Sequence, residues 1–144
     1  MLRDPSLVVL SHQHQHALGV CVRVDRALLH GETSRDELSS DILGLWAAEI
    51  ERHFEAEETI LFPACRAAGM AALVDELLAE HAELRKCQHR IDLGPVRLED
   101  VRHFVDTLSA HVRKEERQLF EGCQKLIKPA EMLKLGDAIK EFFD

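Results

Sequence analysis

Two ten-residue stretches, His53–Phe62 (HFEAEETILF) and His111–Phe120 (HVRKEERQLF), share the pattern H-x3-E-E-x2-L-F. Three residues further on, each stretch reaches a cysteine, Cys65 in the first and Cys123 in the second. In both, a glutamate follows the histidine after four residues, and residues four apart lie on one face of an α-helix. The repeat therefore predicts two helices that each present a histidine and a glutamate on the same face.

Around this repeat, apolar residues recur at steps of three and four along most of the chain, which is the period of an amphipathic helix. Helix-ending pairs interrupt the pattern, among them His30-Gly31, Gly94-Pro95 and Lys128-Pro129. Ser34 begins an S-x-x-E capping box, which is typical of a helix start. The pattern predicts four long helices: one opening at Pro5–Ser6 and ending near 30, one from 34 into the region 63–69, one over about 70–93, and one ending at 128.

We expect an all-α fold. Short connections between long helices make consecutive helices antiparallel, which gives an up-down-up-down four-helix bundle. A short amphipathic segment over 132–143 is expected to form a fifth, C-terminal helix that packs across the end of the bundle. No stretch alternates like a strand, and 144 residues at 16.4 kDa correspond to a single domain over 1–144.

The chain carries 26 acidic and 18 basic residues, a formal charge of −8, together with nine histidines and no tyrosine. This balance argues against binding to nucleic acid or to an anionic membrane, because both need a basic surface. No apolar run is long enough to cross a bilayer, and the first residues show no signal peptide. The four cysteines form no CxxC pair, so we expect reduced thiols in the core of a cytoplasmic protein.

Each of the four long helices places a histidine on its apolar face, and the second and fourth add a glutamate one turn later. Burying an unpaired ionisable side chain is costly. A single case is commonly a hydrogen-bonded core histidine, but one on every helix calls for a shared partner. We therefore predict a metal centre on the bundle axis, with the candidate ligands His14, His53, Glu57, His81, His111 and Glu115.

The mixture of ligand types favours two ions over one. A carboxylate can bridge two metal ions through its two oxygens, whereas imidazole is a terminal ligand. Two glutamates with several histidines thus favour a dinuclear site for an intermediate metal such as iron. Zinc prefers a closed site with four ligands, so zinc, like manganese, is a less favoured occupant. Phe54, Phe62, Phe104 and Phe120 are expected to pack in the core and to keep bulk water from the ions.

The chain resembles the hemerythrin-like, or HHE cation-binding, domains over roughly residues 10–127. Four segments in matching order carry the resemblance: Leu10–Leu18 (LSHQHQHAL), His53–Pro63, Ala79–Leu84 (AEHAEL) and His111–Phe120. The resemblance implies a bundle that holds two non-haem irons, bridged by the helix-2 and helix-4 carboxylates and by a solvent-derived oxygen species. Ferritin-like di-iron proteins match less well, because they use a Glu-x-x-His motif that this sequence lacks.

Carried over by position, the resemblance assigns the helix-2 ligand pair to His53 and Glu57. It assigns the helix-4 pair to His111 and Glu115, and the helix-3 histidine to His81.

The first helix offers three histidines, His12, His14 and His16. We favour His14, because it shares a face with Leu18 and because Gln13-His14 stands where family members often show an acid followed by histidine. His16 lies about 200° around the helix from His14, so the two are not expected to face one centre. His12 and His16 are the alternatives to His14, and both are otherwise expected in solvent.

The chain departs from the oxygen-carrying members of this family at two places. They have a second helix-3 histidine one turn before the first, where this chain has Leu77. They also place an aspartate five residues after the helix-4 histidine, a spacing held here by Glu116, which is therefore the alternative to Glu115. The missing histidine would leave one iron open to water, O2, peroxide or nitric oxide, unless another side chain fills the position.

These departures favour the binding or sensing of O2, nitric oxide or iron over oxygen transport. The alternative is a redox enzyme that reduces peroxide, oxygen or nitric oxide, although no separate acid–base constellation points to one. Glu58 and Glu80 adjoin proposed ligands and are expected on solvated faces, with contact to the ligands as the alternative. The sequence indicates neither a protein partner nor an oligomeric state.

Overall fold

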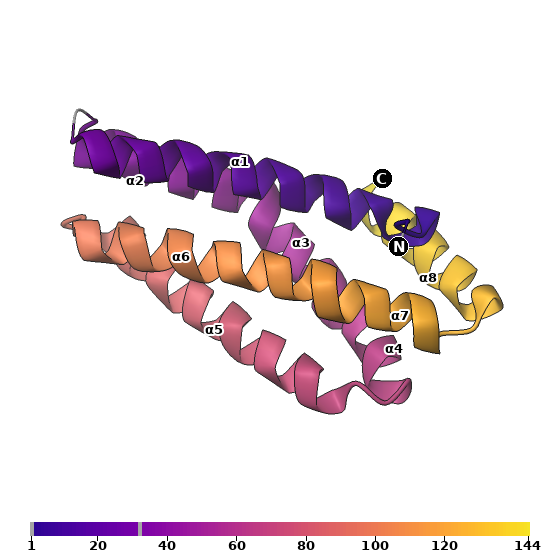
Figure 1. Cartoon of the computed structure of the whole chain (residues 1–144). Coiled ribbons are helices and arrows are strands. Elements are labelled where there is room, and N and C mark those ends of the chain that lie inside the picture. Colours follow the sequence, from indigo (N-terminus) through magenta and orange to yellow (C-terminus); the bar gives the residue numbers. More distant parts are fainter. Residues whose placement is uncertain (1, 32) are drawn as a thin grey trace.

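The structure, a computed structural model, describes residues 2–31 and 33–144, and every regular element among them is helical (Figure 1). A 3₁₀ turn, η1 (Pro5–Leu7), leads into α1 (Val8–His30). A second, continuous rod consists of α2 (Arg35–Leu45), η2 (Trp46–Ile50), α3 (Glu51–Ala56), η3 (Glu57–Leu61) and α4 (Phe62–Ala67). The third and fifth rods are α5 (Ala71–Leu93) and α8 (Pro129–Phe143), and the fourth consists of α6 (Leu98–Lys114), η4 (Glu115–Phe120) and α7 (Glu121–Leu126).

Successive long rods run in opposite directions, and the C-terminal α8 crosses one end of the bundle (Figure 1). The first and fourth rods pack together through α1 and α6, and α5 packs against both α6 and α2. The predicted up-down-up-down bundle with a fifth helix is therefore confirmed. The fifth helix begins at Pro129, three residues earlier than expected, because proline fits the first turn of a helix, where its missing N–H would have no partner.

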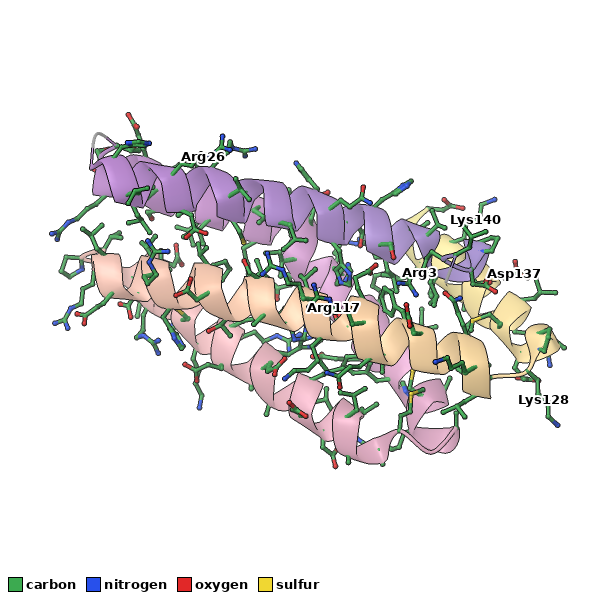
Figure 2. All side chains as sticks on the ribbon, viewed as in Figure 1. Arg3, Arg26, Arg117, Lys128, Asp137 and Lys140 are labelled. Carbon is green, nitrogen blue, oxygen red and sulfur yellow. The ribbon has the colours of Figure 1, made fainter. Side chains whose placement is uncertain are left out.

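Local signals in the sequence define the helix ends. The Ser34 hydroxyl accepts a hydrogen bond from the Glu37 N–H at 3.1 Å, as the capping-box pattern predicts. Gly31 ends α1 in the left-handed conformation, with φ of 67°, which glycine adopts without steric cost. Charged side chains such as Arg26, Lys128 and Lys140 lie on the outside of the bundle (Figure 2). None of the helices in the described ranges is long and apolar enough to span a membrane.

Two apolar clusters fill the bundle, one toward each end. The first, which includes Trp46, Phe54 and Phe104, lies toward the α1–α2 and α5–α6 connections. The second, which includes Phe62 and Phe120, lies toward the N-terminus and α8. Between them is a layer of buried polar side chains: His14, His53, Glu57, His81, His111 and Glu115. The apolar clusters therefore enclose the predicted site from both ends.

The helices are not regular at this polar layer. π-helical turns begin at Glu57 (η3) and at Glu115 (η4), the two glutamates of the repeated motif. In η3 the Phe62 N–H bonds to the Glu57 carbonyl, five residues back. The interpretation of both stretches as regular α-helix was therefore wrong locally. Such π turns are rare and often occur at functional sites.

Gly136 of α8 lies against the start of the chain. A Cβ at this position would be 2.5 Å from the Ser6 Oγ and 3.0 Å from its Cα, so α8 must shift to accept any larger side chain. By contrast, a Cβ at Gly19 in α1 would meet nothing within 4 Å.

We predict that Gly136→Ala lowers the free energy of unfolding by about 1–3 kcal/mol, because of overpacking against Ser6. The matched variant Gly19→Ala should instead raise it by up to about 1 kcal/mol, because alanine favours helix. Chemical denaturation followed by circular dichroism measures both. Equal effects of the two substitutions would contradict the close docking of α8.

Candidate metal centre

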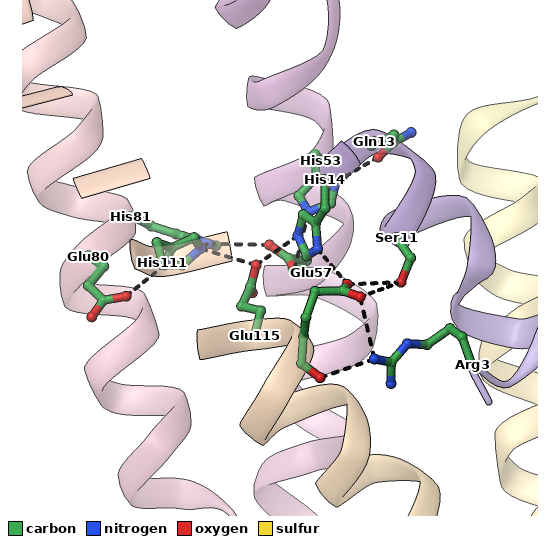
Figure 3. A network of polar contacts seen from close by, with 11 residues as sticks. Arg3, Ser11, Gln13, His14, His53, Glu57, Glu80, His81, His111 and Glu115 are labelled. Carbon is green, nitrogen blue, oxygen red and sulfur yellow. Dashed lines mark hydrogen bonds and ion pairs between the residues drawn. The ribbon is translucent and has the colours of Figure 1, made fainter. Parts of the chain in front are cut away.

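Six buried polar side chains converge from the four long rods (Figure 3). They are His14 from α1, His53 from α3, Glu57 from η3, His81 from α5, His111 from α6 and Glu115 from η4. None is more than 5% exposed, and both glutamates are fully buried. The structure therefore brings together all six residues that the sequence suggested as ligands.

The six residues form two overlapping groups. His14 and His53 belong to one group, His81 and His111 to the other, and Glu57 and Glu115 to both. Within each group, one potential ligand atom per residue lies within 4.8 Å of the others. Two groups of four donors that share two carboxylates are consistent with a binuclear metal site.

Each glutamate contacts two histidines, one from each group. The carboxylate of Glu57 lies 3.3 Å from the Nε2 of His53 and 3.3 Å from the Nε2 of His81. The carboxylate of Glu115 lies 3.1 Å from the Nε2 of His14 and 3.2 Å from the Nε2 of His111. Both carboxylates therefore stand between the two groups, which is the position that a bridging ligand needs.

Several donor atoms at the centre make no hydrogen bond with any residue that the structure describes. They are the Nε2 of His53, both carboxylate oxygens of Glu57 and one oxygen of Glu115. A buried polar atom without a partner costs about 1–3 kcal/mol. A cation placed among these atoms would satisfy all of them, so the residues present fit a metal centre.

The pKa values of the buried carboxyls and of His53 shift in directions that reflect how much positive charge lies beside each group. Burial, and then the charge of Glu115, raise the pKa of the Glu57 carboxyl well above its usual value. For Glu115, burial is outweighed by the charge and hydrogen bond of His111, so its pKa is held well below the usual value. Burial and the neighbouring His14 lower the pKa of His53. Glu57 is thus the carboxylate that these side chains compensate least.

A second layer of side chains contacts the outer nitrogen, Nδ1, of every histidine. Carboxylates accept from three of them: Glu116 from His14 at 2.7 Å, Glu58 from His81 at 2.8 Å, and Glu80 from His111 at 2.7 Å. The Gln13 Oε1 accepts from His53 at 2.6 Å. The three carboxylates can only accept, so they keep a proton on the facing Nδ1 and leave the inner Nε2 to face the centre.

Aromatic rings close the centre off from water. Phe54 stacks on His81 with ring centroids 3.7 Å apart, and Phe120 stacks on His14 at 5.3 Å. Leu77, at the position of the missing helix-3 histidine, is fully buried in the second apolar cluster. The position of the second helix-3 histidine is therefore occupied by an apolar side chain, which cannot bind a metal ion.

The alternatives raised by the sequence lie outside the buried groups. His12 is exposed, and the His16 side chain is 60% exposed and pairs with Glu49. Glu116 belongs to neither group: its side chain, which is 28% exposed, contacts the outer Nδ1 of His14 together with Ser11 and Arg3. The geometry therefore favours His14 and Glu115 over these alternatives.

Sequence reasoning missed two features of the second layer. Gln13 was considered only as the neighbour of His14, and the cations Arg3, Arg85 and Lys114 were not considered at all. The Gln13 amide meets His53 across 40 positions of sequence. Gln13 directly precedes His14, so the two side chains lie on neighbouring parts of the face that α1 turns toward the bundle. This position was the feature of the sequence that could have indicated a role for Gln13.

All four cysteines are buried and form no disulfide, as expected. Cys65 and Cys123, the pair that extends the repeat, have sulfurs 2.8 Å apart in the second apolar cluster. The hydrogen bond with Cys123, followed by burial, raises the pKa of the Cys65 thiol. The Cys65 thiol is therefore a poor nucleophile.

We predict that Glu57→Gln separates stability from metal binding. In metal-free protein the amide should keep or raise the free energy of unfolding, by roughly 1 kcal/mol, because it replaces a buried carboxyl group whose oxygens have no hydrogen-bond partner among the described residues. The same variant should lose the stabilisation that added divalent ions give the parent protein. Differential scanning calorimetry with and without ions measures both effects, and Glu55→Gln on the exposed face of α3 is the control. A metal-free Glu57→Gln protein clearly less stable than its parent would contradict this account.

The family described as "Hemerythrin HHE cation binding domain" matches residues 6–123. Searches of curated proteins and of solved structures returned no significant match. The matched range includes all six residues of the buried centre and most of the chain. The chain thus belongs to the hemerythrin HHE cation-binding domain family.

Proposed function

We propose that this protein binds two non-haem iron ions and holds a small molecule, such as O2 or nitric oxide, beside them. The observation that carries the proposal is the pair of overlapping four-donor groups with unpartnered buried atoms. His14 and His53 would serve one ion, His81 and His111 the other, and Glu57 and Glu115 both. Bound there, iron would supply a redox-active Lewis acid.

The donor set favours iron. Four imidazole nitrogens with two carboxylates suit an intermediate divalent metal, whereas structural zinc prefers a closed site with four ligands. Neither group contains a cysteine, although soft thiolates are what select copper(I) or zinc.

A cavity of about 20 Å³ adjoins the centre and favours a very small ligand. Its apolar lining includes Ala17, Ile50 and Leu108, and three of the candidate histidines border it. About 10–15 Å³ is the minimum that holds one water molecule, so this cavity suits a diatomic molecule and excludes an organic substrate.

The lining favours binding over turnover. Apart from the candidate ligands, its polar members are Gln13 and Glu49. Each already pairs with a histidine, Gln13 with His53 and Glu49 with His16. Within the described residues, the lining therefore offers no free acid or base to deliver protons to a bound molecule, as a reducing enzyme would need.

We predict that protein purified in air contains about two irons per chain, since the two groups offer two sites. It should also show charge-transfer absorption in the near ultraviolet. Elemental analysis and absorption spectroscopy measure these values. His53→Ala should lose most of the iron, whereas His12→Ala, which changes an exposed residue of α1, should keep it. Uptake of a single zinc, without ferrous iron binding to the metal-free protein, would refute the di-iron proposal.

We predict that reduced, iron-loaded protein binds nitric oxide without consuming it. Ala17→Val, which fills part of the cavity, should weaken nitric oxide binding at least tenfold while leaving the iron content unchanged, because the two γ-methyl groups of valine occupy the ligand's space. Ala79→Val, on the exposed side of α5, is the control. Sustained consumption of nitric oxide or peroxide would instead support the enzyme alternative.

A further inference from the structure

The four Nδ1 contacts of the second layer are chemically unequal. His14, His81 and His111 each donate to a carboxylate, whereas His53 donates to the amide oxygen of Gln13. The Nδ1–oxygen distances span only 2.6–2.8 Å, so the difference lies in the chemistry of the acceptor and not in its reach.

An ionised carboxylate can only accept hydrogen bonds, so it requires a proton on the facing Nδ1. A proton there leaves the lone pair on Nε2, which points into the centre. The negative charge of the acceptor also makes Nε2 a stronger donor to a metal ion. An amide is neutral and can accept through its oxygen or donate through its nitrogen, so Gln13 neither fixes the tautomer of His53 nor strengthens its Nε2 to the same degree.

Each second-layer carboxylate is held by a cation of its own. Arg85 donates to both oxygens of Glu58, at 2.7 and 3.0 Å. Lys114 pairs with Glu80, and Arg3 reaches Glu116 at 3.4 Å. The Gln13 amide takes part in no ion pair. His53 is also the one candidate histidine whose Nε2 lacks a hydrogen-bond partner, among the residues that the structure describes.

The difference falls unequally on the two groups. Both histidines of one group, His81 and His111, are backed by carboxylates. In the other group only His14 is so backed, and His53 depends on Gln13. Glu57 and Glu115 are common to the groups and cannot distinguish them.

We propose that Gln13 is a positioning residue that makes the His14/His53 site the weaker of the two metal sites, so that the ions bind in sequence, the first at His81 and His111. This inference rests on the proposed dinuclear centre. Loss of a second-layer partner typically costs 10–100-fold in metal affinity. The two sites should therefore differ by at least about tenfold.

The test titrates metal-free protein with Co²⁺, followed by calorimetry and by visible absorption. The parent protein should bind two ions in resolved steps. Gln13→Glu should strengthen the weaker step about tenfold, so that the steps merge, whereas Glu58→Gln should weaken the tighter step by a similar factor. Gln15→Glu adds the same charge two residues away on the exposed face of α1 and should leave both steps unchanged.

Proton NMR of protein loaded with one Co²⁺ locates the first ion. The Nδ1–H signals of His81 and His111 should show the large contact shifts of directly bound histidines, and Glu58→Gln should alter one of them. Contact shifts at His14 and His53 instead of His81 and His111 at this stage would overturn the inference, as would two equal binding steps in the parent protein or an equal effect of Gln15→Glu. Absence of any Co²⁺ binding would refute the dinuclear centre itself, which distinguishes failure of the proposed function from failure of this inference.

Discussion

The burial of two glutamates, Glu57 and Glu115, between two apolar clusters is the constraint on which the rest of the structure depends. Both side chains are fully buried, and three of their four carboxylate oxygens make no hydrogen bond. A fold that only maximised apolar burial would place leucine there, as it does at Leu77. The retained carboxylates leave unpartnered oxygens on the bundle axis that a bound cation would satisfy.

The surrounding architecture maintains this arrangement. The first apolar cluster lies on one side of the polar layer and the second on the other, so the rods cannot slide without exposing apolar surface. The π turns that begin at both glutamates shift the helix register just where the polar layer gives way to the second apolar cluster. This shift allows the neighbours Leu61 and Phe62, and likewise Leu119 and Phe120, to be buried below the centre.

The parts of this site that depend on local spacing could be predicted from sequence. A histidine and a glutamate four residues apart must share a face, and glycine or proline at the breaks fixes where the long helices end, so the bundle and the two His–Glu pairs followed. His14 and His81 followed from their positions on otherwise apolar helix faces. Contacts between distant segments could not be predicted in this way. Gln13 meets His53, and Arg3 meets Glu116, only because the first rod packs against the second and fourth. The π turns could not be predicted either, because no residue type specifies them. Pro63 follows η3, but the corresponding stretch after η4 has no proline before Pro129, so proline is not a shared signal for the two turns.

The acidic residues around the centre differ in how their charge is balanced, depending on whether they contact the histidines from outside or lie among them. Glu58, Glu80 and Glu116 each pair with Arg85, Lys114 or Arg3, so the second layer is balanced by side chains of the protein itself. Among residues 2–31 and 33–144, the two inner carboxylates form ion pairs with histidines and with no lysine or arginine. A histidine can neutralise that charge only when its Nε2 carries a proton, and a protonated Nε2 cannot bind a metal ion. The outer pairs occupy the neighbouring Arg85, Lys114 and Arg3, so among the described residues only histidines face the inner carboxylates, which is the arrangement that a cation-binding centre needs.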